Sequence, residues 1–136
     1  MRDADTGRDH GMTVSAFCSV SLEPPLVLVC IGHEASMYPQ LERASHVGIN
    51  VLSATQEALS RRFADPESDR FDGVGYSRGE SGVALLDDAL VHLECHITAR
   101  HEAGDHTVLI AAVDSASVQA GGPLLYYRGG YAQLER

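Results

Sequence analysis

The sequence predicts a mainly β domain of 136 residues, a small antiparallel barrel with two short helices. Residues 90–102 and 107–117 alternate apolar and polar side chains, as strands with one buried face do. Few of the predicted strands are separated by helix-sized connections, which favours antiparallel pairing. We expect the sheet to close on itself because closure removes strand edges with unpaired backbone groups.

The N-terminal part predicts a tail and two strands. Residues 1–10 are polar and charged without periodicity, so we expect a tail or a turn before one domain over 11–136. Residues 11–17 alternate small polar and apolar side chains, which predicts a half-buried strand. The proline pair at 24–25 interrupts this pattern because proline has no N–H to donate. The apolar run 26–31 follows as a buried strand.

A helix and a strand come next. Pro39 is compatible with the first turn of a short helix, which we expect to end near Ala44. Residues 46–52 predict a third strand, with its apolar side chains on one face and Asn50 on the other.

The second predicted helix covers residues 56–63, with Ser53 or Thr55 as its N-cap. Residues 65–82 are polar and rich in glycine, so we expect a long mobile loop. Helices are therefore confined to two short segments.

The C-terminal part predicts two hairpins. A tight turn at 103–106, whose glycine tolerates positive φ, joins the strands 90–102 and 107–117. Residues 124–128 and 131–134 form a last short pair around two glycines.

Composition excludes several classes of function. The net charge of −9 disfavours nucleic acid as a partner, because phosphate backbones require a basic face. All ten basic residues are arginine, so a side chain cannot form a Schiff base. No apolar run approaches the ~20 residues of a membrane helix, and no secretion signal begins the chain. We therefore expect a cytoplasmic protein with no membrane partner.

We expect no metal site. His92, Glu94 and His96 share one face of a predicted strand, where they could bind a metal or form a solvated outer face. The opposite face is fully apolar and accounts for the packing, so the solvated face is favoured. The three cysteines are far apart and form no Cys-x-x-Cys pair, which argues against zinc and against a disulfide framework.

The stretch 11–25 is the best candidate for a binding site. Its small side chains and hydroxyls precede a break in the strand, which suits a backbone that approaches a planar ligand with polar edges. The alternative is a strand–turn–strand corner that binds nothing. The residues alone leave both possibilities open.

This stretch, Gly-Met-Thr-Val-Ser-Ala-Phe-Cys-Ser-Val-Ser-Leu-Glu-Pro-Pro, resembles the signature of the flavin reductase-like family, the small reductase components of two-component flavin monooxygenases. Three further similarities follow in order. They are Gly-Ile-Asn-Val-Leu at 48–52 followed by Arg62-Phe63, Gly-Asp-His at 104–106, and Pro-Leu-Leu-Tyr-Tyr-Arg-Gly-Gly-Tyr at 123–131. Cys18 departs from the pattern, because a hydroxyl residue is common there.

The resemblance implies a fold and a function. The fold is the FMN-binding split β-barrel, which forms a homodimer. The function is NAD(P)H-dependent reduction of flavin, FMN ahead of FAD, with NADH or NADPH as donor and a partner monooxygenase that receives the reduced flavin. The alternatives are a flavin-binding module without turnover and a flavin-dependent reductase of another acceptor, such as ferric chelates or a quinone.

The resemblance also implies binding residues but no certain catalytic residue. Those for flavin are Thr13, Val14, Ser15, Ala16, Phe17, Cys18, Ser19, Cys30, Ile31, Gly32, Ser36, Met37, Asn50, Arg62 and Phe63. Those for nicotinamide are His106, Arg128, Gly129 and Tyr131. Arg62 suits the flavin phosphate because a guanidinium can donate two parallel hydrogen bonds to phosphate oxygens. The alternatives are a solvated helix face for Arg62 and an exposed hairpin histidine for His106.

One departure concerns the N-terminus. Family members usually have a helix and a strand before the signature, whereas residues 2–9 here resemble the hairpin that would follow that strand. We expect the missing strand to leave an unpaired sheet edge, which favours pairing with another strand.

Overall fold

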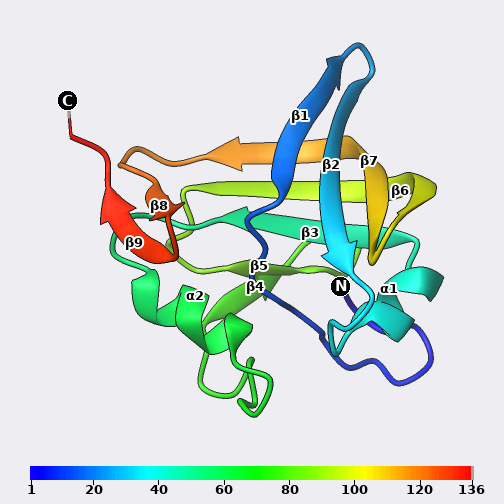
Figure 1. Ribbon diagram of the computed structural model, residues 1–136, viewed down its shortest axis with the longest axis horizontal. Coiled ribbons are helices and arrows are strands. Elements are labelled where there is room, and N and C mark those ends of the chain that lie inside the picture. The colour runs from blue at the N-terminus through cyan, green and yellow to red at the C-terminus, as the bar shows by residue number, and fades with distance from the viewer. Residues whose placement is uncertain (136) are drawn as a thin grey trace.

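The computed structural model describes residues 1–135, with a five-stranded antiparallel sheet at its centre. The order of strands in this sheet is β1-β2-β7-β6-β3, and two short hairpins, β4–β5 and β8–β9, flank it (Figure 1). The strands are β1 Phe17–Leu22, β2 Pro25–Gly32, β3 His46–Val51, β4 Tyr76–Arg78, β5 Ala84–Leu86, β6 Val91–Ala103, β7 His106–Val118, β8 Leu124–Tyr127 and β9 Gly130–Gln133. The helices are α1 Tyr38–Arg43 and α2 Glu57–Ala64.

The sheet is strongly bent. Figure 1 shows β1 and β2 crossing steeply over the direction of β3 and β6. The pairing of β6 with β7 shifts register between Glu94 and Cys95 and again between Ile97 and Ala99, and such irregularities bend strands. β1 and β3 are the two edges of this sheet and do not pair with each other in the described residues, so the barrel is split rather than continuous.

The core lies on the concave side of the sheet. Alternate side chains of β2 point inward, so Val27, Val29 and Ile31 are buried. Cys95 on β6 is fully buried, and burial raises the pKa of its thiol to about 11. The other buried members of this cluster are Met37, Leu41, Val47, Leu109 and Ala111.

The first predicted strand begins later than expected. Residues 11–16 are irregular, and the strand covers Phe17–Leu22. Backbone bonds explain the difference: the Thr13 N–H donates to the carbonyl of Phe63 on α2 (3.2 Å), and Ala16 offers its carbonyl to the N–H of Cys30 (2.9 Å). The segment is therefore held between a helix and a strand edge, so alternation of side chains does not indicate a ladder here.

Both helices are confirmed, but the predicted N-cap of α2 is wrong. The cap position is Gln56, and no side chain caps the helix. Instead, the Gln56 side-chain oxygen accepts a hydrogen bond from the N–H of Ser53 (2.9 Å), and the hydroxyls of Ser53 and Thr55 bond to each other (3.2 Å). These polar groups stabilise the turn before the helix rather than its first N–H groups.

Part of the predicted loop 65–82 is ordered as a strand. Tyr76–Arg78 pairs with Ala84–Leu86 to form a small hairpin. Each of these strands has three residues, which is too short for alternation to be visible in the sequence.

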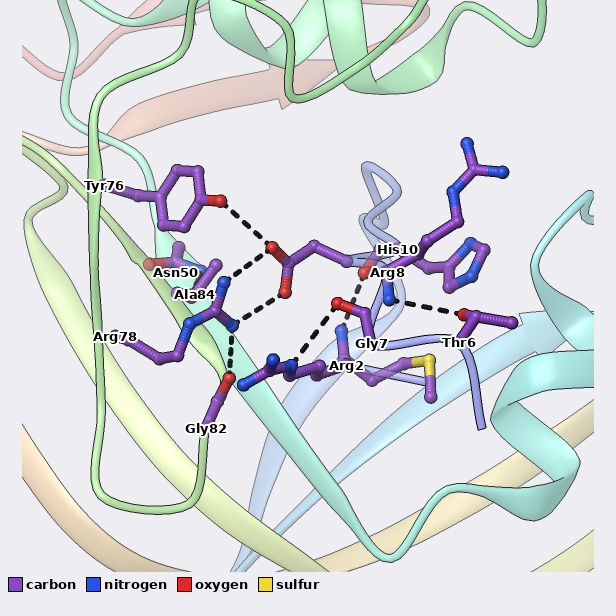
Figure 2. A network of polar contacts seen from close by, with 12 residues as sticks. Arg2, Thr6, Gly7, Arg8, His10, Asn50, Tyr76, Arg78, Gly82 and Ala84 are labelled. Atoms are coloured by element: carbon purple, nitrogen blue, oxygen red, sulfur yellow. Dashed lines mark hydrogen bonds and ion pairs between the residues drawn. The ribbon is translucent and has the colours of Figure 1, made fainter. Parts of the chain in front are cut away.

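Residues 1–10 form a closed turn. Of the tail and the turn that the sequence allowed for this segment, the turn is correct and the tail is wrong. Arg2 and Asp9 pair as an isolated bridge, and the Asp3 N–H donates to the carbonyl of Arg8 (2.8 Å). This turn docks on β4, because the Asp9 carboxylate accepts two hydrogen bonds from Arg78 (both 2.9 Å) and one from the hydroxyl of Tyr76 (3.0 Å). Figure 2 shows Tyr76 and Arg78 directed toward the turn. The turn and the β4–β5 hairpin are thus linked through one carboxylate.

The outer face of β6 is less solvated than predicted. A ring nitrogen of His92 lies 2.6 Å from the carbonyl oxygen of Leu86, and Glu94 accepts hydrogen bonds from the hydroxyls of Ser81 (2.8 Å) and Ser115 (2.9 Å). The β4–β5 hairpin therefore covers these two side chains, whereas His96 is exposed. Residues 1–135 contain no group of three or more His, Cys, Asp or Glu side chains arranged to hold a metal.

Within the same range, neither helix is long and apolar enough to cross a membrane.

Candidate functional site

The predicted corner lies where residues 14–19 run beside the end of β2. Ser15, Ala16, Cys18 and Ser19 are exposed, so no bulky side chain covers this backbone. Across residues 1–135, the N–H groups of Val14, Ser15 and Ala16 have no hydrogen-bond acceptor in the protein. Consecutive free N–H groups on a bent backbone form an anion- or carbonyl-binding concavity, so the corner fits a ligand with polar edges.

A cavity of about 620 Å³ lies beneath this corner. One of its walls consists of the predicted residues Thr13, Val14, Ser15 and Phe17. Its remaining lining is mostly apolar and includes Ile31, Met37, Phe63 and Tyr131. An apolar cavity with a few polar groups at one rim is typical of sites for planar cofactors.

Two predicted polar residues use their side chains within the protein. The hydroxyl of Thr13 donates to the carbonyl of Ser60 (2.6 Å). The side chain of Asn50 accepts from the N–H of Leu86 (2.9 Å) and donates to the carbonyl of Ala84 (3.4 Å). Both residues therefore hold neighbouring segments in place.

Arg62 and Phe63 do not face the same space. Phe63 is buried and lines the inner cavity, whereas Arg62 lines an outer cleft of about 790 Å³ beside α2. The Arg62 guanidinium donates to the carbonyls of Arg70 (2.9 Å), Asp69 (2.7 Å) and Asp72. In the described part of the chain its Nη1 group has no acceptor, so this nitrogen alone is available for a phosphate.

Gly32, the last residue of β2, lies beside His106, the first residue of β7. They are register partners, and a Cβ atom on Gly32 would lie 3.6 Å from Nε2 of His106. Nδ1 of His106 lies 2.7 Å from a carboxylate oxygen of Asp105, and this hydrogen bond lowers the pKa of Asp105. A carboxylate only accepts, so Nδ1 carries a proton, and Nε2 is left to face the Gly32 side.

The remaining predicted flavin residues differ in exposure. Ser36 is exposed, Cys30 is half-buried on β2, and Met37 is buried in the core. Met37 can therefore contact a ligand only from the inner cavity, whereas Ser36 is accessible from solvent.

The other predicted nicotinamide residues lie on the β8–β9 hairpin. Arg128 (φ 52°) and Gly129 (φ 78°) form its two-residue turn, in the positive-φ geometry that matches strand twist. Tyr131 hydrogen bonds through its hydroxyl to the hydroxyl of Ser60 (2.8 Å), and the guanidinium of Arg61 lies 4.7 Å from its ring centre. Figure 1 shows this hairpin at the opposite end of the molecule from the β6–β7 turn, so one chain does not bring all four predicted residues together.

Comparison with models of known protein families assigns this chain to a family. A family model described as the flavin reductase like domain matches residues 3–135. The chain belongs to this family. The predicted relationship is therefore confirmed, and the match covers nearly the whole chain.

Relatives within the flavin reductase-like family support the same assignment. An NADH-dependent flavin reductase from Rhodococcus sp is 44% identical over 128 residues, covering 93% of this chain and 70% of the relative. A structure of the NADH:FAD oxidoreductase from Streptomyces globisporus, in complex with NAD and FAD fragments, has a TM-score of 0.89 at 40% identity, with 93% of this chain and 78% of that chain covered. A nitrilotriacetate monooxygenase component B homolog from Mycobacterium thermoresistibile has a TM-score of 0.91 at 32% identity, with 96% and 74% covered. The predicted split-barrel fold is thereby confirmed.

In this flavin reductase-like domain, sequence reasoning missed Ser60 and Thr107. Ser60 is buried and joins Thr13 to Tyr131, so one residue of α2 holds both sides of the inner cavity. Thr107 is buried directly after His106. The sequence contained a signal for Thr107. Side chains alternate along a strand, so Thr107 points to the inner face of β7 if His106 points outward.

Proposed function

We propose that this chain is the reductase component of a two-component monooxygenase system, with FMN as its preferred flavin and NADH as its donor. Its activity is the NADH-dependent reduction of flavin, which is the activity of its family. The observation that carries the proposal is the free backbone corner at residues 14–16, which lies beside the end of β2 where Gly32 and His106 meet.

The corner would hold the polar edge of the flavin. The N–H groups of Val14, Ser15 and Ala16 suit the ring carbonyls and nitrogens, and the exposed hydroxyls of Ser15 and Ser19 add further donors. Phe17 and Ile31 offer apolar surface toward the cavity. Cys18, Cys30, Gly32 and Ser36 do not line the cavity and would contact the flavin only from outside it. The free Nη1 of Arg62 would hold the phosphate, while Thr13, Met37, Asn50 and Phe63 shape the wall and floor.

The bound isoalloxazine supplies the two-electron hydride chemistry of the reaction. The contribution of the protein is positioning, which requires no general acid or base. Small side chains at the corner let the ring approach the backbone, and the apolar cavity wall limits access of water to one side. Nε2 of His106 would orient the nicotinamide amide at the Gly32 edge through a hydrogen bond.

We also propose that the active form is a homodimer. The β6–β7 turn, after which β7 begins at His106, lies at the opposite end of the molecule from the β8–β9 hairpin, which carries Arg128, Gly129 and Tyr131 (Figure 1). A second copy would therefore have to complete the nicotinamide site. Val20 and Leu22 on the edge strand β1 are 48% and 95% exposed, and such apolar side chains favour burial against another chain. Light scattering coupled to size exclusion would show a monomer if this proposal is wrong.

Mixing the purified protein with FMN and NADH tests the activity. Loss of absorbance near ~340 nm, the band of reduced nicotinamide, is expected with FMN and more slowly with FAD or with NADPH. Bound yellow flavin without NADH oxidation would instead indicate a binding module. Faster oxidation with ferric chelates or a quinone than with free flavin would indicate a different acceptor.

Transfer to a partner requires a second experiment. Adding a flavin monooxygenase of matched flavin preference should couple NADH oxidation to product formation. If the reduced flavin stays bound during gel filtration under anaerobic conditions, flavin is a fixed prosthetic group, and the proposed supply of flavin to a partner is wrong.

A further inference from the structure

Thr107 is the centre of a hydrogen-bond network at the β6–β7 tip. Its side-chain oxygen lies 2.8 Å from the hydroxyl of Tyr38, 3.1 Å from Nε2 of His33 and 3.1 Å from a carboxylate oxygen of Glu102. Thr107 is only 3% exposed. A buried hydroxyl with three side-chain partners is unusual, because most side-chain hydrogen bonds go to the backbone or to water.

The chemistry of these groups assigns every proton in the network. A carboxylate only accepts, so Thr107 donates its one proton to Glu102. Its two lone pairs must then accept from the Tyr38 hydroxyl and from a protonated Nε2 of His33. The other carboxylate oxygen of Glu102 lies 3.0 Å from the same Nε2. Removal of the Thr107 hydroxyl would leave the Tyr38 hydroxyl without this partner, while His33 and the exposed Glu102 would keep their contact with each other.

The network joins four separate segments at the tip. Glu102 and Thr107 are cross-strand partners at the ends of β6 and β7. His33 follows β2, and its N–H also donates to the carbonyl of Asp105 in the turn (2.9 Å). Tyr38 begins α1, and its ring lies 4.9 Å from that of His33.

The position of Thr107 relative to His106 gives this network a consequence for function. Successive side chains on a strand point to opposite faces, so anchoring Thr107 inside determines the direction of His106 outside. The hairpin is long, with thirteen residues in each strand, and its turn lies beside the end of β2 and α1 (Figure 1), where Gly32 pairs with His106. The β2–β7 pairing places His106 beside Gly32, and the side-chain network under Thr107 adds a second constraint on the same backbone.

We infer that His33, Tyr38, Glu102 and Thr107 are positioning residues for the nicotinamide donor, acting through His106. This inference rests on the proposed function. None of the four needs to touch the donor. Their effect is to hold the backbone that carries the contacting side chain, so they should influence NADH binding rather than flavin binding.

The test compares Thr107→Val, which keeps the shape and loses the hydroxyl, with Thr107→Ser, which keeps the hydroxyl. Thr107→Val should raise the KM for NADH roughly fivefold, the factor expected for one hydrogen bond of ordinary net strength, with kcat and the Kd for FMN within about twofold. Thr107→Ser and the matched control Thr98→Val should retain wild-type constants. Thr98 lies on the same hairpin, where its exposed hydroxyl donates only to the carbonyl of Ile110 (3.2 Å).

A double mutant separates this inference from the proposed role of His106. In a His106→Ala background, Thr107→Val should cause no further rise in KM. An unchanged KM in Thr107→Val alongside a raised KM in His106→Ala would overturn the network inference alone. An unchanged KM in His106→Ala would overturn both. If Thr107→Val does not fold, Tyr38→Phe gives the same test, and a lower melting temperature without a change in KM would show a structural role only.

Discussion

Phe63 on α2 lies directly against Gly11 in the predicted signature. A Cβ atom at Gly11 would come within 2.8 Å of Cε1 of Phe63 and 3.2 Å of the ring of Phe71. The two phenylalanine rings meet edge to face, with centres 5.0 Å apart. The start of the signature is therefore a glycine because the backbone passes over an aromatic pair with no room for a side chain.

Gly11→Ala should destabilise the protein by ~1–3 kcal/mol, the usual cost of overpacking a core site. Chemical denaturation measures this difference as a lower midpoint at an unchanged slope. Gly122→Ala is the matched control, since nothing lies within 4 Å of its Cβ position. Equal stability of the two variants would contradict the close packing of Phe63 over Gly11.

Thr13 and Ser15 should affect different properties although both lie in the proposed flavin corner. Thr13→Val leaves the carbonyl of Ser60 without its donor and should lower the free energy of unfolding by ~1–3 kcal/mol. Ser15→Ala removes an exposed hydroxyl and should leave stability unchanged, while it weakens FMN binding up to about fivefold. Denaturation and FMN fluorescence titration distinguish the two. Weaker FMN binding with Thr13→Val at unchanged stability would reverse the assignment.

The hydrogen bonds between Asp9 and Arg78 predict that the protein loses stability in acid. Hydrogen bonds from Arg78 lower the pKa of Asp9, so its carboxylate stabilises the fold fully above the ordinary aspartate pKa of ~3.9. This contribution disappears as the pH falls below that value toward the lowered pKa. Asp9→Asn should cost ~1–3 kcal/mol at neutral pH and should flatten the fall in stability below about pH 4.

Asp5→Asn is the control for this measurement, because Asp5 is exposed on the same N-terminal turn. Its denaturation curves should follow the wild type at each pH. An Asp9→Asn variant with the acid profile of the wild type would show that the contacts with Arg78 and Tyr76 contribute nothing to folding.

The space at Gly32 should limit NADH binding. An added methyl group at Gly32 would make an ordinary contact with the ring of His106, at 3.6 Å from Nε2, so Gly32→Ala should keep near-normal kinetics. Gly32→Val adds two further methyl groups and should displace the ring, raising the KM for NADH several-fold. Steady-state kinetics at saturating FMN measures both, and equal KM values would place His106 away from the nicotinamide.

The cysteines provide a chemical probe of the flavin site. Cys18 is exposed in the proposed corner, whereas Cys95 is buried and its pKa is raised to about 11 by burial. Because the thiolate is the reactive form, iodoacetamide should modify Cys18 first and Cys95 only after unfolding. Saturating FMN should slow the modification of Cys18, as measured by mass spectrometry. Modification at the same rate with and without FMN would place the flavin elsewhere.

Local pattern accounts for most of the correct predictions. The long alternation of 90–102 and 107–117 specified the central hairpin, because a one-residue slip would expose its entire apolar face. The strands β4 and β5 were missed because three residues carry no readable period. The strand predicted for 11–17 failed for a different reason: its partners are a helix carbonyl and a strand end, which lie far away in the sequence.

The functional site, like the fold, has features that the sequence predicts and features that only the structure shows. The sequence by itself determined the family, the small side chains of the corner, and the displayed histidine of the Gly-Asp-His turn, because these depend on residue type and order within short segments. The free N–H groups of the corner were visible only in the structure. Only the tertiary structure decided that Arg62 is held by loop carbonyls, that Arg62 and Phe63 face different spaces, and that Thr107 anchors the tip under His106. The physical reason is that a hydrogen bond between side chains depends on distance in space, and residues as far apart as Tyr38 and Thr107 meet only after the sheet has formed.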